Sequence, residues 1–207
     1  MEFALWIYKP LEDAKIEKLM NPSLDLSVRL KNGAPEEPLS GEKAEAVFYG
    51  TTLKRVQPSM EYKTVRRREF LREPLLGVSG SFMPDFDRQE AEEEEIGVSV
   101  LRVFGRLYYA EHNSFDTLKL LTWATEAPGK DKGFRTVLFA TFQDKDKAEG
   151  APVNFRKVVL PKAFVESYEE YYDDKDGMGS FQAVFRQSVA ELTEAQKHMA
   201  EAAMKAK

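Results

Sequence analysis

The stretch Val158–Gln187, VVLPKAFVESYEEYYDDKDGMGSFQAVFRQ, gives the best clue to the fold. Two segments rich in Val, Phe and Tyr flank the turn sequence Asp173–Gly177, which is the usual sequence pattern of a β-hairpin. We predict strands over Arg156–Tyr171, interrupted near Pro161, and over Gly179–Gln187. The second half of the chain therefore ends in a pair of antiparallel strands.

A helix is predicted before this hairpin, over Phe115–Glu126. Leu118, Leu121, Thr122 and Thr125 recur at helical spacing, which is typical of one helix face. We expect the helix to pack on a sheet through Leu118, Leu121 and Thr122.

The rest of the chain reads mainly as short strands. A weak helix is expected over Leu11–Met20, and a helical tail over about 194–207, where Thr193 and Gln196 form a capping box. Together these elements predict one β-rich domain over residues 1–207, an antiparallel β-sandwich or barrel with one packed helix and a C-terminal helix. The other predicted strands are Phe3–Tyr8, Leu24–Leu30, Ala46–Tyr49, Leu53–Val56, Val78–Met83, Gly97–Tyr109 and Phe134–Phe142.

Composition excludes several classes of function. The 207 residues include 43% hydrophobic and 31% charged residues, which is typical of a globular chain. Cysteine is absent and only two histidines occur, which excludes disulfides, thiol nucleophiles and thiolate metal sites. The net charge of -5 argues against a dedicated nucleic-acid binder. The N-terminus has no signal-peptide pattern and no apolar run is long enough for a membrane helix, so we expect a cytoplasmic protein.

Two runs of opposite charge stand out. Asp85–Glu95 holds seven acids and one Arg, and it predicts an exposed loop. Arg66–Arg68 is a basic cluster in a mixed segment, Tyr62–Leu71. Each run is ordinarily solvated surface, but together they could bring copies of the chain into contact or bind different partners.

No catalytic constellation emerges from the motifs. His112–Asp116 contains His, Ser and Asp, but adjacent residues rarely converge as a triad, and Asn113 or Ser114 fits a helix cap better. Asp176–Gly179 lacks the remaining residues of a nucleotide-binding loop. An acidic cluster on the strand predicted over Arg156–Tyr171 and the turn after it could serve glycoside hydrolysis or a Mg²⁺ site. Glu166 and Glu170 are expected on one face of that strand. Polar positions on a solvated strand explain the cluster more simply. Its members are Glu166, Glu169, Glu170, Asp173 and Asp174. We therefore expect no catalytic, cofactor-binding or metal-binding residue.

The order of elements from Gly97 to Gln187 resembles the tube proteins of contractile injection machines. These are the phage tail tube proteins and the haemolysin-coregulated tube protein of type VI secretion. The resemblance rests on a strand at Val98–Tyr109, the helix with DTLKLLTWA (Asp116–Ala124), the strand FRTVLFATF (Phe134–Phe142) and the final hairpin.

The resemblance implies a structural subunit without chemistry or cofactor. Such subunits form hexameric rings that stack into a hollow tube, with the chain itself, and sheath, spike or baseplate proteins, as partners. It also implies assembly in the cytoplasm and possible export within a particle. The resemblance also fits a baseplate or tube-end component of such a machine. Two alternatives outside this family stay open: a β-rich adaptor or binding module that uses its two charge runs, and a hydrolase that uses the acidic cluster.

Overall fold

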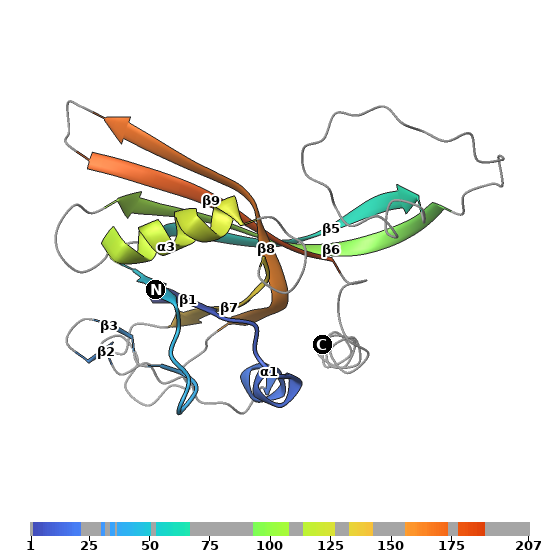
Figure 1. Ribbon diagram of the computed structural model, residues 1–207, viewed down its shortest axis with the longest axis horizontal. Coiled ribbons are helices and arrows are strands. Elements are labelled where there is room, and N and C mark those ends of the chain that lie inside the picture. The colour runs from blue at the N-terminus through green and yellow to red at the C-terminus, as the bar shows by residue number, and fades with distance from the viewer. Residues whose placement is uncertain are drawn as a thin grey trace.

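The computed structural model describes residues 2–21, 30–31, 34–35, 37–50, 53–66, 93–107, 114–126, 133–142, 156–173 and 178–188. Within them the chain is mainly β, and seven strands form one antiparallel sheet in the order β4-β1-β7-β8-β9-β6-β5 (Figure 1). The strands are β1 (Glu2–Tyr8), β4 (Ala46–Tyr49), β5 (Leu53–Arg66), β6 (Glu93–Leu107), β7 (Arg135–Phe142), β8 (Lys157–Asp173) and β9 (Met178–Ser188). Two short strands, β2 (Leu30–Lys31) and β3 (Ala34–Pro35), pair separately, and the helices are α1 (Asp13–Met20) and α3 (Ser114–Thr125).

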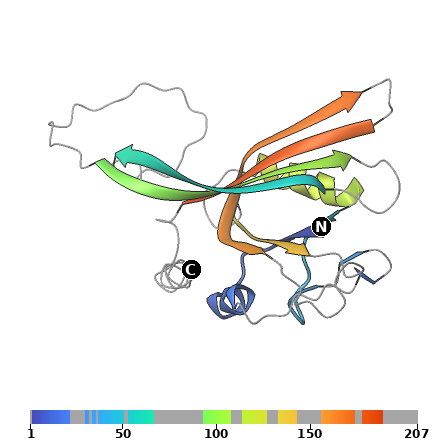
Figure 2. The same cartoon turned by 180° about the vertical axis from the view of Figure 1, so that it is seen from behind.

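Strand β8 turns a corner between two halves of the sheet. Its first part, up to Ala163, pairs with β7, and its second part, from Phe164, pairs with β9. The β7 register shifts opposite Pro161, and the strand bends in this region (Figures 1 and 2). A proline has no N–H to give to a ladder, so an irregular stretch accommodates it. The predicted interruption near Pro161 is therefore wrong: the strand continues through the proline.

The main core lies between the two halves of the sheet. Side chains from β1, β4 and β7 meet side chains from β6, β8 and β9, and α3 packs against the same cluster. A second cluster lies on the opposite face of β1 and β7, and Leu19 of α1 belongs to it. Strand β1 is thus covered on both faces, which explains its unbroken apolar sequence.

The packing face of α3 differs from the prediction. Leu120 and Trp123 are buried, whereas Leu118 is 56% exposed and Leu121 is 37% exposed. Thr122 is exposed as well. An indole ring buries more surface than a leucine, so the helix is oriented by Trp123 rather than by the leucine stripe.

Most predicted strands are confirmed, with ends that differ by a few residues. Leu53–Val56 proves to be the start of a single 14-residue strand, β5, which also takes in the first part of Tyr62–Leu71. The hairpin pairing of β8 with β9 is confirmed. Three predictions lie outside the described residues: Val78–Met83, most of Leu24–Leu30, and the helical tail.

The acidic loop predicted over Asp85–Glu95 needs a correction. Its last three acids belong to β6, where Glu93 pairs with Arg66, Glu94 with Val65 and Glu95 with Thr64. Pairing with the long strand β5 gives these three residues ladder partners and makes them strand rather than loop. Residues 85–92 and Arg67–Arg68 lie outside the described part of the chain.

Candidate functional site

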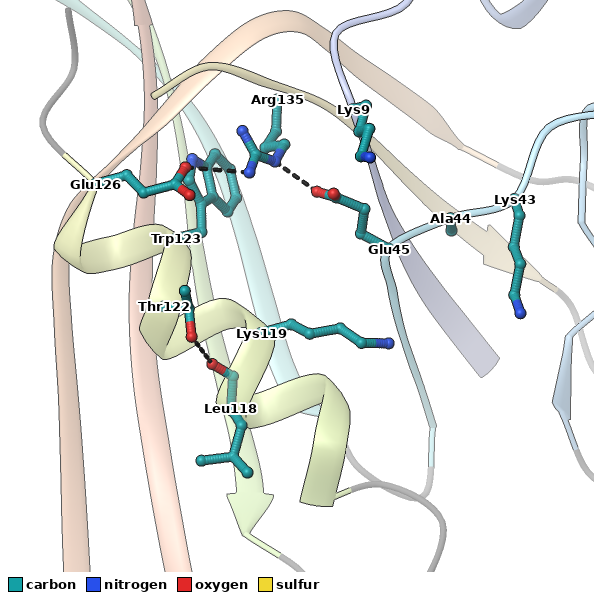
Figure 3. A pocket seen from close by; sticks show the side chains of 10 residues that line it. All are labelled: Lys9, Lys43, Ala44, Glu45, Leu118, Lys119, Thr122, Trp123, Glu126 and Arg135. Carbon is teal, nitrogen blue, oxygen red and sulfur yellow. Dashed lines mark hydrogen bonds and ion pairs between the residues drawn. The ribbon is translucent and has the colours of Figure 1, made fainter. Parts of the chain in front are cut away.

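A cleft opens between α3, the end of β1 and the residues before β4 (Figure 3). We call it the α3 cleft. Helix α3 forms one wall, and Arg135 at the start of β7 lies at its inner end. The cleft is lined by Lys9, Lys43, Ala44, Glu45, Leu118, Lys119, Thr122, Trp123, Glu126 and Arg135.

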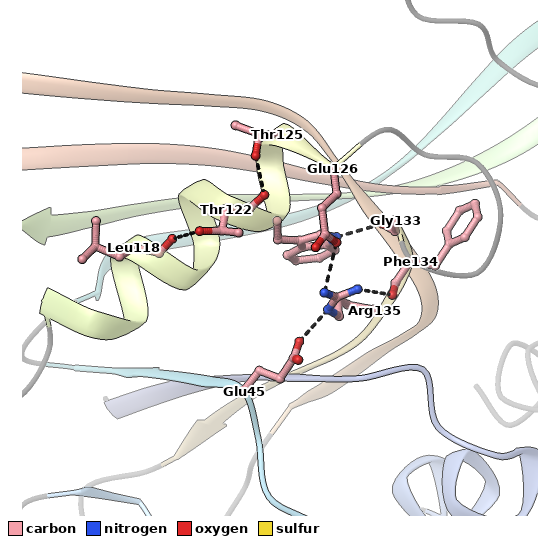
Figure 4. A network of polar contacts seen from close by, with 9 residues as sticks. Glu45, Leu118, Thr122, Thr125, Glu126, Gly133, Phe134 and Arg135 are labelled. Atoms are coloured by element: carbon pink, nitrogen blue, oxygen red, sulfur yellow. Dashed lines mark hydrogen bonds and ion pairs between the residues drawn. The ribbon is translucent and has the colours of Figure 1, made fainter.

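Arg135 holds the walls of this cleft together (Figure 4). Its guanidinium donates to Glu45 at 2.5 Å, to Glu126 at 3.1 Å and to the Phe134 carbonyl at 3.0 Å. It also lies 5.9 Å from the centre of the Trp123 ring. Because these partners come from three separate segments, one side chain fixes α3 against β7 and the segment before β4.

The rim of the cleft is basic. Lys9, Lys43 and Lys119 line it, while Glu45 and Glu126 are paired with Arg135 and Lys119 is paired with Asp116 at 3.0 Å. Among the described residues no ion pair involves Lys9 or Lys43. The charge of Lys9 and Lys43 therefore favours an acidic ligand or partner.

Asp116 in the first turn of α3 covers one edge of the sheet. Its carboxylate accepts from the Val47 backbone N–H at 3.3 Å and from Lys119 at 3.0 Å. Val47 belongs to the edge strand β4, so the helix occupies a donor that another strand could otherwise use. The opposite edge strand, β5, contains Pro58, which removes one donor from the ladder.

The outward face of α3 presents apolar groups to solvent. It comprises Leu118, Leu121, Thr122 and Thr125, spaced as one side of a helix. Thr122 and Thr125 donate to the Leu118 and Thr122 carbonyls, so their hydroxyls are satisfied within the helix (Figure 4). This leaves mainly methyl groups on the surface, and such a face is typical of an interaction site.

A second exposed apolar group lies at the far end of the β8–β9 hairpin. We call Glu169–Asp173 and their partners Met178–Gln182 the hairpin end. Tyr171 is 54% exposed and Tyr172 is 65% exposed. Tyr171 donates to Glu169 on one face of the strand, and Tyr172 donates to Glu170 on the other. Each tyrosine is thereby held against its own carboxylate.

The acidic cluster predicted on this strand does not form an acid pair. The β8 register shifts between Val165 and Ser167, at Glu166. After this shift Glu170 lies opposite Phe181 on the core face, whereas Glu166 contacts Arg186 on the other face, at 2.8 Å. The expected shared face of Glu166 and Glu170 is wrong, because a bulge reverses strand parity.

Glu170 instead accepts hydrogen bonds from Tyr168 and Tyr172. Tyr168 donates to it at 2.5 Å and stacks on Phe181. Burial, together with this hydrogen bond, raises the pKa of Tyr168 well above its usual range. Asp173 ends β8, and Asp174 lies outside the described residues, as does the segment Asp176–Gly177.

A charge network crosses the sheet on the face away from α3. Arg102 contacts Glu61 at 2.7 Å, and Arg186 contacts both Glu61 at 3.5 Å and Glu166 at 2.8 Å. The hydrogen bond from Arg102 lowers the pKa of Glu61. Sequence reasoning missed this network, because it joins strands distant in the chain. The alternation of Arg102 with apolar residues was its only signal.

The His-Ser-Asp motif is only partly described. The Asp116 carboxylate accepts hydrogen bonds from the Val47 backbone N–H and from Lys119, and Ser114 is the first residue of α3. His112 and Asn113 lie outside the described residues. Neither helix of the described part has the length and apolar composition needed to cross a membrane.

Comparisons with known proteins give one likeness in structure. No family model matches the chain, and no curated protein matches it. The fold is coarsely similar to a chain in the tail of an empty gene transfer agent (GTA) particle determined with C6 symmetry. That likeness has a TM-score of 0.31 and 11% sequence identity, and it covers 72% of this chain and 83% of the other.

Proposed function

We propose that this chain is a structural subunit that assembles with copies of itself into the rings or tube of a phage-tail-like contractile injection system. One observation carries the self-assembly: the outward face of α3, which has the sequence of a buried helix face, lies in solvent. The tube role extends from the sequence resemblance over Gly97–Gln187.

Leu118 and Leu121 are the apolar residues of this face that a partner would bury. Trp123 faces the core of the subunit, and a helix packed in this way ordinarily carries polar residues on its opposite, solvent-facing side. Here Leu118 and Leu121 occupy that side, one turn apart. Burying each leucine against a partner would contribute about 1.5–3 kcal/mol. Association therefore removes a surface that folding alone leaves exposed.

The structure supports the two alternatives less well. An adaptor that uses separate charge runs gains no support from the described residues, in which Arg66 is opposite Glu93 in the β5–β6 pairing, and the rest of both runs lies outside them. A hydrolase that uses Glu166 and Glu170 requires both carboxylates on one side of the strand, and they lie on opposite faces.

Negative-stain microscopy and sedimentation velocity test the proposal. We expect the purified chain to form rings or larger oligomers as its concentration rises, and Leu118→Glu with Leu121→Glu to remain monomeric. Lys18→Glu on exposed α1 is the matched control, because it changes net charge by the same amount away from α3. Monomers at every concentration, or a double variant that assembles like the wild type, would refute the proposal.

A further inference from the structure

We infer that the hairpin end of one copy occupies the α3 cleft and the outward face of α3 on the next copy. This contact rests on the proposed self-assembly and specifies which two surfaces meet. It is heterologous, so each subunit offers a donor surface and an acceptor surface, and repetition of the contact builds a ring or a helix.

Apolar exposure identifies the two surfaces. Among the described residues, five large hydrophobic side chains are exposed. Leu118 and Leu121 lie together on α3, Tyr171 and Tyr172 lie on opposite faces of the hairpin end, and Met60 lies apart on β5. Tyrosine is favoured at interfaces, because its ring buries much apolar area while its hydroxyl keeps a polar partner.

Charge makes the two surfaces complementary. The described part of the hairpin end contains three acids, Glu169, Glu170 and Asp173, and no Lys or Arg. The α3 cleft is lined by Lys9 and Lys43, which form no ion pair among the described residues, and by Lys119, which is paired with Asp116; its own carboxylates are paired with Arg135 (Figure 3). Acid on one surface and base on the other orient two copies head to tail and disfavour contacts between like surfaces.

The hairpin end cannot occupy the α3 cleft of its own subunit. Its strands pair along the whole length from Phe164 opposite Arg186 to Asp173 opposite Met178. The hairpin therefore behaves as a stiff arm, and Figures 1 and 2 show its strands diverging from α3 toward the turn. Tyr171 also lies on the face of the sheet away from α3, since its partner Ser180 alternates with the core residue Phe181. A contact between Tyr171 and Leu121 must join two molecules.

The absence of cysteine permits a direct test on the full chain. We would introduce Leu121→Cys and Tyr171→Cys, singly and together, and treat assembled protein with a short bismaleimide cross-linker. The double variant should give a ladder of linked multimers on a denaturing gel. Each single variant alone should give none, and an equal mixture of the two should give dimers.

Three outcomes would overturn the inference. Dimers from Leu121→Cys alone would mean that helix faces meet each other. Rings that form without any ladder would mean that another surface fills the cleft, while the proposed function survives. A wild-type chain that stays monomeric at every concentration would remove the proposed function and this contact together.

A second measurement does not depend on cross-linking geometry. Replacing Tyr171 and Tyr172 by Ser should weaken association by about tenfold or more, as expected for interfacial aromatic residues. Mixing this variant with Leu118→Glu/Leu121→Glu should restore one-to-one dimers, because each partner retains one intact surface. A mixture that stays monomeric while wild-type protein assembles would contradict a heterologous contact.

Discussion

The indole ring of Trp123 stacks on the phenyl ring of Phe185, with centroids 5.3 Å apart and planes 15° apart. The indole N–H donates to the Gly133 carbonyl at 2.8 Å. This pair joins α3 to β9 and determines which side of the helix faces the core. It also explains why Leu118 and Leu121 remain outside.

Replacement of Trp123 should therefore destabilise the subunit far more than replacement of Leu118. Trp123→Ala removes a buried ring and should lower the free energy of unfolding by about 3–5 kcal/mol. Leu118→Ala removes exposed surface and should change it by less than about 0.5 kcal/mol. Denaturant unfolding of dilute, monomeric protein measures both. Equal losses would mean that α3 packs through the leucine stripe.

Arg135 should be the main polar link between α3 and β7. Arg135→Met leaves Glu45 and Glu126 without their cation and should cost about 1–3 kcal/mol of unfolding free energy, since both carboxylates keep some contact with water. Arg135→Lys should recover part of the loss, because one ammonium cannot bridge both acids as a guanidinium does. Thermal unfolding should rank the three proteins by stability, with the wild type first, Arg135→Lys second and Arg135→Met last.

A double-mutant cycle checks the ion pair itself. Glu45→Gln in the Arg135→Met background should add less destabilisation than Glu45→Gln in the wild type, because the two residues are in direct contact at 2.5 Å. Simple additivity would show that the contact contributes nothing.

Stability should fall at alkaline pH because of Tyr8. Its hydroxyl is buried and donates to Glu37 at 3.0 Å, and burial together with that carboxylate raises its pKa well above the usual range. The unfolded chain releases this proton near about pH 10, whereas the folded chain retains it. The contribution is therefore fully present below about pH 10 and is lost progressively as pH rises further.

Tyr8→Phe provides the comparison for this pH effect. We expect the variant to lose stability less steeply than the wild type above about pH 10, with unfolding followed by fluorescence and tyrosinate absorbance. Parallel stability curves for the two proteins would assign the alkaline transition to other groups.

The backbone register that places Arg66 opposite Glu93 predicts an effect within one subunit. Opposite charges directly across a strand pair contribute about 0.2–1 kcal/mol. Arg66→Glu should lower stability by about that amount, and the exchange Arg66→Glu with Glu93→Arg should restore it. Sedimentation of the same proteins shows whether assembly changes independently. A variant that unfolds normally but fails to assemble would place Arg66 in a contact between copies.

The local sequence determined the secondary structure of most described elements. Alternation, apolar runs and turn residues were sufficient for β1, β4, β7, β9, the hairpin and the helix at Ser114–Thr125, because these signals act between near neighbours in the chain. The mainly β, antiparallel fold class also followed from them.

Tertiary structure decided what the local pattern could not. Periodicity shows that α3 has an apolar stripe, but which side turns inward depends on the ring of Phe185, which lies 62 residues beyond Trp123. Parity along β8 depends on a bulge at Glu166, and the acids at Glu93–Glu95 form a strand because β5 lies beside them. Packing competes across the whole core, so its outcome depends on residues that no local window contains.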